Sequence, residues 1–480
     1  MRILLIRPPR PPKAITIGEF MFCEPLGLEA VYGVLREKHQ VSILDMMAEQ
    51  VDIKEYLREQ QPEAVGITAL CIDVTNVLEL ARVVKEIDAS IPVVVGGTQA
   101  QVMPQAFADP AIDYVMHVTT EAGLHGLFDA LSASALGASA AAATSSEVRT
   151  NNNKETTDLP GTTNITGVFA VRKGIPENIR IRKNEYLVPD RSSCQQYRSQ
   201  YSYFGYKPCA LLQTSQGCST CCTFCLRWRI EGGKEAHQDM EVIFRQIREI
   251  HEPSIMIIDN DFLCSNERLE QLCDFLAQEK ISKTFLCYGS VQSVRHNRDS
   301  VRRFAKHGLR AVLVGYESFH PSELAGYQKK ATVEGNLEVA RLLRQWGVDA
   351  WASFIMHPDW DHTDFKDFRR YISELRPEIS SLSPLTPFPG LPAFQEFEDR
   401  LLFDVKDYEQ WSFSNISIRP SKMSLRVYYA EVLLTNLQVN FFMNNALYLV
   451  RRFGLRTLFR LTIGGCRLTL RYLAAMRRAR

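Results

Sequence analysis

The 480-residue sequence lacks an excess of charge of either sign and lacks a long, purely apolar run. Its 56 Lys and Arg balance 55 Asp and Glu, which argues against a general nucleic-acid-binding protein, because such proteins usually carry a strong basic excess. The nearest candidate for a membrane-spanning helix, residues 432–450, contains asparagines and a glutamine that make insertion costly. The N-terminus has four consecutive apolar residues before charge and prolines, too few for a signal-peptide core. We therefore expect no spanning helix and a cytoplasmic location.

The twelve cysteines need not form disulfide bonds. A chain of 480 residues buries on the order of 75% of its unfolded surface, which is enough for a stable core without covalent cross-links. In a reducing compartment, clustered cysteines more often bind metal or carry out redox chemistry than form disulfides. The ten histidines are scattered and suggest no second metal motif, and His357 is expected to be a loop residue.

Residues 1–131 alternate between short apolar strands and helical segments. The expected strands are residues 2–6, 41–45, 64–68 and 91–95, and the expected helices include residues 26–38 and 74–87. Strands separated by helices of about 10–15 residues predict a doubly wound parallel sheet. Sheets of this kind bind ligands beyond the carboxyl ends of their strands.

The composition changes abruptly over residues 132–164, which are mostly Ala, Ser, Thr and Asn. This segment predicts a linker or insertion without a core of its own, and its Ala-rich part is a candidate helix. Alternation resumes over residues 165–424 and predicts a full or partial parallel (β/α) barrel. Its expected strands include residues 210–214, 255–258, 284–288, 311–315 and 350–356. A basic helical region is expected over residues 425–480.

Cys218, Cys222 and Cys225 form a Cys-x-x-x-Cys-x-x-Cys motif directly after an expected barrel strand. Three thiolates on one short loop can hold three irons of a [4Fe–4S] cluster and leave the fourth iron for an external ligand. Cys221 opens an alternative in which abutting cysteine pairs form two zinc half-sites, although structural zinc sites normally separate such pairs by a substantial loop. A four-cysteine cluster of an electron carrier and a buried cysteine-rich turn are further alternatives.

The cysteine loop, with an aromatic residue before its last cysteine, resembles the cluster motif of the radical S-adenosylmethionine (SAM) superfamily. The resemblance implies that SAM binds the open iron and is cleaved to a 5′-deoxyadenosyl radical. The segments 258–262, 315–318 and 386–390 resemble motifs of members that also carry a cobalamin domain, and Gln292 stands where those members often have an arginine. The SAM contacts implied by this resemblance are Phe224, Asp259, Asp261, Gln292 and Glu317.

Residues 1–131 resemble a cobalamin-binding domain. Residues 45–50 align with an Asp-x-His-x-x-Gly motif, but Met47 replaces the histidine that lies beneath cobalt in other such domains. The cobalamin contacts implied by the resemblance are Asp45, Met47, Thr68, Leu70, Gly96 and Gly97. Small residues at the Gly-Gly turn would let the backbone approach the cofactor closely. The alternative is a degenerate domain that keeps the fold and binds no cofactor.

Together these resemblances imply methylation of an unactivated carbon by a cobalamin-dependent radical SAM enzyme. The pattern over the whole chain, including residues 24–29 and 358–361, is most similar to the hopanoid C-3 methylases. That similarity implies a small hydrophobic substrate, such as a hopanoid-like lipid, and an external electron donor of the flavodoxin or ferredoxin type. The alternatives are an oxidative cyclase or rearrangement enzyme of the anaerobic porphyrin ring cyclase type, and a non-catalytic cobalamin or cluster sensor.

After Glu431 the chain has nine arginines and no acidic residue. Six of the arginines share roughly one face of the expected helices: Arg452, Arg456, Arg460, Arg467, Arg471 and Arg478. A basic amphipathic helix can rest on an anionic bilayer, which would place the protein at the inner face of the membrane. The alternative is a helix packed on the barrel with its arginines in solvent. Gly464 and Gly465 are expected to interrupt the helix.

Overall fold

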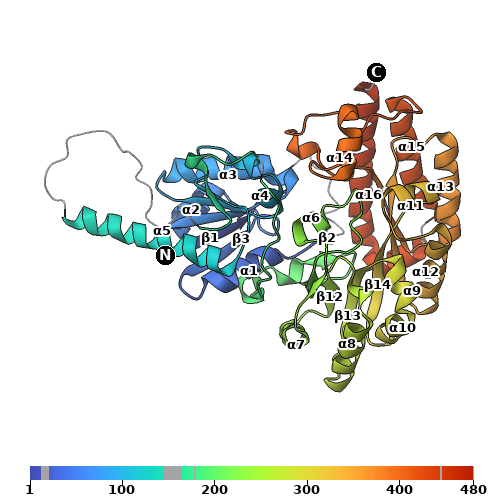
Figure 1. The fold of residues 1–480 in the computed structure, drawn as a ribbon, viewed down its shortest axis with the longest axis horizontal. Coiled ribbons are helices and arrows are strands. Elements are labelled where there is room, and N and C mark those ends of the chain that lie inside the picture. Colours follow the sequence, from blue (N-terminus) through green and yellow to red (C-terminus); the bar gives the residue numbers. More distant parts are fainter. Residues whose placement is uncertain (12–20, 145–164, 178, 444–445, 479–480) are drawn as a thin grey trace. The chain divides into compact units, whose positions relative to one another are not determined.

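The computed structural model describes residues 1–11, 21–144, 165–177, 179–443 and 446–478 (Figure 1). The fold divides into two compact units. The first comprises Met1–Ala14 and Pro25–Tyr197, and the second comprises Ile15–Glu24 and Arg198–Arg480.

Unit 1 is built on a six-stranded sheet in the order β3-β1-β4-β5-β6-β7. The parallel strands are β1 (Arg2–Arg7), β3 (Gln40–Asp45), β4 (Ala64–Thr68), β5 (Val93–Gly96) and β6 (Tyr114–Met116). The helices include α1 (Leu26–Leu35), α2 (Ile53–Gln60), α3 (Val74–Ile87), α4 (Thr98–Val102) and α5 (Glu121–Thr144). The strands β1 and β4 are nearly continuous apolar runs, as expected where helices cover both faces of a sheet. The predicted doubly wound sheet is confirmed.

The segment predicted as a linker, residues 132–164, begins inside a helix, because α5 continues to Thr144. Residues 145–164 lie outside the described residues. The chain from residue 165 to Tyr197 belongs to unit 1, whereas the sequence assigned it to the barrel. Its strand β7 (Val168–Ala170) pairs antiparallel with β6, and the Asp190 N–H donates to the Glu29 carbonyl at 3.0 Å. A three-residue strand offers too little periodicity to be recognised in the sequence.

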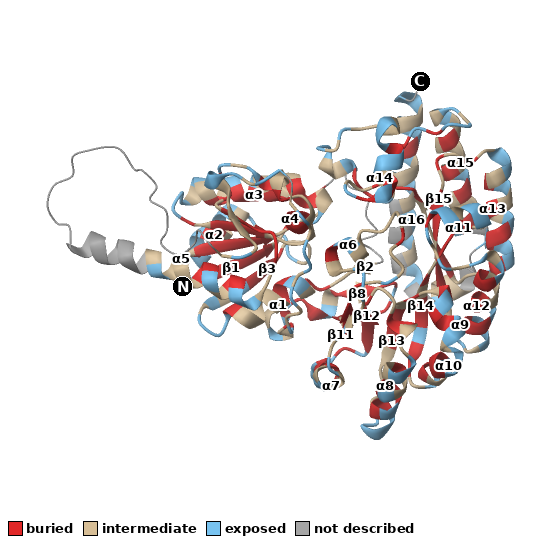
Figure 2. Ribbon diagram, viewed as in Figure 1, coloured by how far each residue is buried: buried red, intermediate tan, exposed pale blue. Residues whose placement is uncertain are grey.

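Unit 2 contains a six-stranded parallel sheet with its strands in chain order, which makes the predicted barrel a partial one. Its strands are β9 (Cys209–Leu212), β12 (Ser254–Ile257), β13 (Thr284–Gly289), β14 (Leu309–Glu317), β15 (Asp349–Met356) and β16 (Ile379–Pro384). The intervening helices include α7 (Met240–Glu249), α8 (Asn266–Gln278), α9 (Val291–His296), α10 (Arg298–Lys306), α12 (Val333–Gln345) and α13 (His362–Leu375). The strands are buried, and the helices expose their outer faces (Figure 2).

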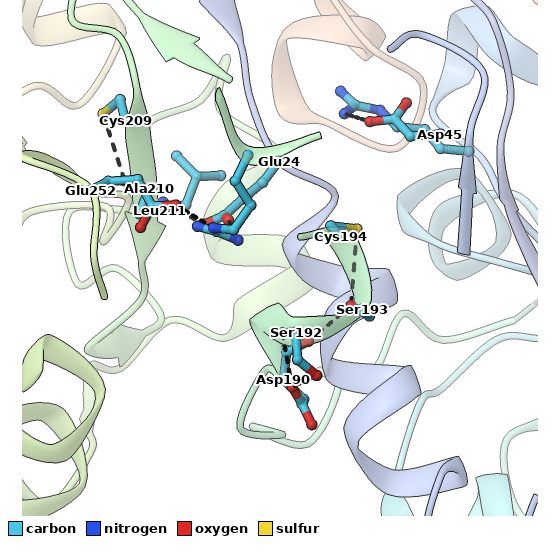
Figure 3. A network of polar contacts seen from close by, with 12 residues as sticks. Glu24, Asp45, Asp190, Ser192, Ser193, Cys194, Cys209, Ala210, Leu211 and Glu252 are labelled. Atoms are coloured by element: carbon cyan, nitrogen blue, oxygen red, sulfur yellow. Dashed lines mark hydrogen bonds and ion pairs between the residues drawn. The ribbon is translucent and has the colours of Figure 1, made fainter. Parts of the chain in front are cut away.

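A buried ion network fastens residues 21–24 to the barrel sheet of unit 2. Glu24 is 3% exposed, its Oε2 lies 2.7 Å from Arg198 Nη1, and its Oε1 accepts the Leu211 N–H at 2.5 Å on strand β9 (Figure 3). Arg198 also pairs with Glu252. The same segment contributes β2 (Met21–Phe22), which pairs with β8 (Ser202–Tyr203). Glu24 therefore holds a segment in place at the edge strand of the barrel sheet.

The C-terminal region is helical, as predicted. Helix α15 (Leu425–Gln438) leads through a π-helical turn to α16 (Ala446–Arg478). The break in α16 lies at Gly454, with φ +72°, and the prediction of a break at Gly464–Gly465 is wrong, because those residues keep a helical backbone. Gly454 alone adopts the left-handed region that glycine tolerates at little cost. Among the described residues, no helix has the length and apolar character needed to cross a membrane.

Candidate functional site

The cysteine motif lies on the loop between β10 (Ser215–Gln216) and α6 (Arg227–Glu231). The loop begins at Gly217 with φ +94°, and a Cβ atom there would lie 2.0 Å from the Lys234 carbonyl oxygen. The Cys218 N–H donates to the Gly232 carbonyl at 3.0 Å, and Asn260 Nδ2 donates to the Gly217 carbonyl at 2.9 Å. This close approach requires glycine at position 217, so backbone contacts define the path of the loop.

The thiols of the motif are free and partly shielded from solvent. Cys222 is buried, and Cys218 and Cys225 are half-buried. Burial raises the pKa of Cys222 to about 12, against the opposing effect of Lys329, and burial also raises the pKa of Cys225. Such thiols ionise when a metal cation replaces their protons. Three cysteine sulfurs on one loop are a donor set that fits a [4Fe–4S] cluster.

Cys221 differs from the other cysteines of the loop in its backbone. Its φ of +53° lies in the left-handed region, and its Sγ donates to the Cys218 carbonyl at 3.5 Å. The Cys222 carbonyl instead accepts the Trp228 Nε1–H at 2.9 Å and the Cys225 N–H at 3.1 Å. The turn that contains Cys222 and Cys225 is therefore held by its own hydrogen bonds, without the Cys221 thiol.

Glu317, a predicted SAM contact at the end of β14, forms a shielded ion pair with Lys329. Lys329 Nζ lies 3.0 Å from Glu317 Oε1, and the two side chains are 13% and 9% exposed. Gly315 leaves room for the pair, because a Cβ at position 315 would lie 2.2 Å from Glu317 Oε1 and 2.7 Å from Lys329 Nζ. The charges of both side chains act on the thiol of Cys222. The sequence did not indicate Lys329, which is one of two adjacent lysines just after the short helix Pro321–Gly326.

Phe224 links the cysteine loop to the chain that carries Lys329. Its ring meets the Tyr327 ring edge to face, with centroids 5.2 Å apart. The Thr223 N–H donates to the Tyr327 carbonyl at 3.2 Å. Together with the effect of Lys329 on Cys222, these contacts bring the predicted cluster ligands, Phe224 and Glu317 into one region of unit 2.

The two aspartates predicted to contact SAM follow β12 and are hydrogen-bonded within the protein. Asp259 accepts the Thr214 N–H at 2.6 Å and the Ser215 hydroxyl at 2.7 Å. Asp261 accepts the Ser290 N–H at 3.1 Å and thereby ties the end of β12 to the start of α9. Burial raises the pKa of both carboxyl groups. These bonds connect neighbouring strand ends, and direct contact with SAM stays a prediction. Gln292 lies exposed in the first turn of α9.

The predicted cobalamin contacts lie at or just beyond the carboxyl ends of strands in unit 1. Thr68 ends β4 and Gly96 ends β5. Gly97 has φ +93°, and a Cβ there would lie 2.7 Å from Thr68 Oγ1 and 2.8 Å from the Ala69 nitrogen, so the turn requires glycine. Leu70 is 42% exposed at the same edge. An open edge with a close backbone approach fits the binding of a large ligand.

Asp45 lies at the end of β3 and is fully buried. Its Oδ1 accepts the Met47 N–H at 3.0 Å, and its Oδ2 lies 3.3 Å from Arg7 Nη1. Asp45 thus orders the turn that carries the half-buried Met47. The parallel strands lie in the order β3-β1-β4-β5-β6, which is 2-1-3-4-5 when only the parallel strands are counted along the chain. In sheets of this order, ligands bind at the switch point between the first and third strands, which here are β1 and β4.

The described residues also bring together Glu235, His237 and Cys264, whose ligand atoms lie within 4.8 Å of one another. The sequence did not suggest this group, because the residues come from two segments of the chain. The Cys264 thiol donates to Glu235 Oε2 at 3.1 Å, and the Ser219 hydroxyl donates to Glu235 Oε1 at 3.1 Å. The nearby charge of Arg268 contributes to a lowered pKa of His237, after the larger effect of burial. The carboxylate and thiol therefore have hydrogen-bond partners without a cation.

Comparison with known families matches each unit to a model. Residues 18–127 match the B12 binding domain, and residues 212–372 match the radical SAM superfamily. The chain combines a B12-binding domain with a radical SAM domain. The radical SAM match begins at the end of β9 and includes the cysteine loop, Glu317 and Lys329.

Several relatives align with most of the chain. The hopanoid C-3 methylase of Methylococcus capsulatus is 26% identical over 422 residues, which cover 87% of this chain and 76% of the relative. The anaerobic magnesium-protoporphyrin IX monomethyl ester cyclase of Cereibacter sphaeroides is 24% identical over 420 residues, which cover 84% of this chain and 64% of the relative.

The fold is also similar to that of a solved structure. The radical SAM methyltransferase TsrM from Kitasatospora setae, with cobalamin and a [4Fe–4S] cluster bound, superposes with a TM-score of 0.65 over 90% of both chains at 16% identity. The similarity extends over both units of the chain and is a similarity of fold.

Proposed function

We propose that the protein is a cobalamin-dependent radical SAM methyltransferase that methylates an unactivated carbon. The observation that carries the proposal is the three-cysteine loop packed beside the shielded Glu317–Lys329 pair, in a chain that also has a B12-binding domain. We assign cobalamin binding to residues 1–131 and the radical chemistry to the part of residues 165–424 that belongs to unit 2. We assign residues 425–480 to a basic helical region.

In this proposal Cys218, Cys222 and Cys225 hold the [4Fe–4S] cluster. When bound, the cluster supplies the electron that cleaves SAM, and cobalamin carries the methyl group. Glu317, whose carboxylate is paired with Lys329, would accept a hydrogen bond from the amino group of SAM. Phe224, Asp259, Asp261 and Gln292 complete the proposed SAM contacts. The proposed cobalamin contacts are Asp45, Met47, Thr68, Leu70, Gly96 and Gly97.

The proposed substrate is a small hydrophobic molecule, such as a hopanoid-like lipid. The Methylococcus relative is a hopanoid C-3 methylase, and its alignment over most of both chains supports this class. Radical SAM proteins need an external reductant, which we propose is a flavodoxin or ferredoxin. We place the protein in the cytoplasm, in peripheral contact with the inner face of the membrane through its C-terminal arginine-rich helices. No nucleic acid is expected as a partner.

The second candidate function is an oxidative cyclisation, which the alignment with the Cereibacter cyclase favours. Both functions would produce 5′-deoxyadenosine, but a methyltransferase alone would move label from the methyl group of SAM into the product. A cobalamin or cluster sensor would bind the cofactors and produce no 5′-deoxyadenosine with any substrate. Product analysis with methyl-labelled SAM and candidate lipids therefore separates the three functions.

The ligand assignment is tested by alanine variants of the four loop cysteines after anaerobic cluster reconstitution. At neutral pH, we expect each of Cys218→Ala, Cys222→Ala and Cys225→Ala to abolish SAM cleavage. Each variant should also lack the absorbance of the iron–sulfur cluster. Cys221→Ala is the matched control and should keep iron and sulfide at wild-type stoichiometry, because its thiol bonds to a backbone carbonyl. Loss of the cluster in Cys221→Ala, with retention in Cys218→Ala, would overturn the assignment.

A further inference from the structure

Five large apolar side chains of α16 are exposed. They are Leu455, Phe459, Ile463, Leu470 and Leu473, with exposed fractions of 73%, 68%, 39%, 65% and 41%. All five follow the break at Gly454 and therefore lie on one continuous helix. At about 100° per residue, they fall within roughly 80° of one another and form a single apolar stripe. A contiguous exposed apolar surface of this kind marks an interaction site.

The other side of α16 is fixed to unit 2. Tyr472 is 4% exposed, and its hydroxyl donates to the Ser414 carbonyl at 2.6 Å. Its ring meets the Tyr429 ring of α15 with centroids 5.4 Å apart, and Arg426 Nε donates to the Met476 carbonyl at 3.0 Å. The helix is thus anchored by one side, and the apolar stripe lies away from that anchor.

The charged side chains of α16 are all positive. After Glu431 the sequence has nine arginines and no acidic residue, and the described side chains of Arg467, Arg471, Arg477 and Arg478 are exposed. The predicted arginine face also included Arg452, Arg456 and Arg460, whose side chains lie outside the described residues. A second copy docked through the same stripe would bring two arginine-rich helices together, which like-charge repulsion opposes. An anionic surface with an apolar interior satisfies both features.

We propose that the exposed stripe of α16 inserts into the interface of an anionic lipid bilayer, with the neighbouring arginines at the phosphate headgroups. Leu455, Phe459 and Leu470 are the most exposed members of the stripe and would enter the acyl-chain boundary. The helix lies in the plane of the interface, as an amphipathic helix with a basic polar face does. This inference specifies the membrane contact of the proposed function. Vesicle binding itself needs neither the cluster nor cobalamin, so it can be tested separately from the chemistry.

The test is flotation of the full chain with vesicles of phosphatidylglycerol and phosphatidylcholine, compared with vesicles of phosphatidylcholine alone. We expect binding to the anionic vesicles that weakens as salt is raised, because exposed charges are screened. The variant Leu455→Glu/Phe459→Glu should bind at least about tenfold more weakly, since it removes apolar insertion and adds negative charge. Phe413→Glu is the matched control, because Phe413 is 63% exposed in unit 2 but lies outside α16.

Unchanged thermal unfolding of the double variant would show that lost binding is not lost folding. The proposal is overturned if the wild-type chain does not float with anionic vesicles, or if the double variant and Phe413→Glu bind equally well. It is also overturned if the wild-type chain is a dimer by light scattering that the double variant dissociates, because the stripe would then be a protein interface. Vesicle binding without SAM cleavage would support the membrane contact and contradict the proposed function alone.

Discussion

The conformation of Gly217 leads to a sharp prediction about the cysteine loop. Replacing Gly217 with alanine forces a residue with a Cβ into φ +94° and places that Cβ 2.0 Å from the Lys234 carbonyl. The left-handed backbone costs about 1–2 kcal/mol for a residue other than glycine. Relief of the contact needs a backbone shift, with a further cost of about 1–3 kcal/mol. The expected destabilisation is therefore about 2–5 kcal/mol, concentrated at the loop that carries the cysteines.

Gly347→Ala is the matched control, because Gly347 has φ +70° in the same unit and a Cβ there would meet no atom within 4 Å. This control variant should lose only the free energy that a left-handed backbone costs a residue other than glycine, about 1–2 kcal/mol. In scanning calorimetry of the anaerobic protein, Gly217→Ala should lower Tm by about twice as much as the control or more. After reconstitution it should also hold far less iron and sulfide. Equal Tm values and equal iron content in the two variants would refute the role assigned to this contact.

Three further predictions concern buried and paired charges. Glu24→Ala should lower the free energy of unfolding by about 3–5 kcal/mol in urea titrations, because it leaves part of a buried ion network uncompensated. Lys329→Met should move the midpoint potential of the reconstituted cluster to a more negative value by roughly 60 mV, since it removes a shielded positive charge. Lys330→Met is the control, because Lys330 is exposed. Equal shifts of the potential in the two variants would contradict the prediction. Burial alone would raise the pKa of Asp359, but hydrogen bonds from Arg400 and Ser421 lower it from 3.8 to about 2. The stability from this group is present above pH 4 and is lost as the pH falls toward 2, so Asp359→Asn should flatten that part of the curve of unfolding free energy against pH.

The repeated βα units could be predicted because their strands are apolar runs separated by amphipathic helices. The predicted strands 64–68 and 284–288 overlap β4 and β13 almost residue for residue. The missed strands were short or polar: β7 has three residues, and β16 contains three serines in six positions. The break at Gly454 was also missed, because a lone glycine gives a weaker sequence signal than the Gly464–Gly465 pair that remains helical.

The candidate site was predictable to the extent that its residues lie on one loop or at strand ends. The cysteine motif needs only sequence spacing, whereas the Glu317–Lys329 pair depends on a fold that returns the chain to β14 twelve residues later. The hydrogen bonds that occupy Asp259 and Asp261 come from other strand ends and from α9, so their partners could not be read from local sequence. The exposure of the α16 stripe likewise depends on which side of the helix packs on unit 2.

The most direct test of the proposed function is incubation of the reconstituted, cobalamin-supplied protein with reductant, methyl-labelled SAM and candidate polycyclic lipids under anaerobic conditions. The expected result is 5′-deoxyadenosine, S-adenosylhomocysteine and label in a carbon-methylated lipid, with cobalamin retained by the protein. Formation of 5′-deoxyadenosine with cobalamin unbound and no label transferred would contradict the methyltransferase function and leave a radical SAM protein whose N-terminal unit does not bind its cofactor.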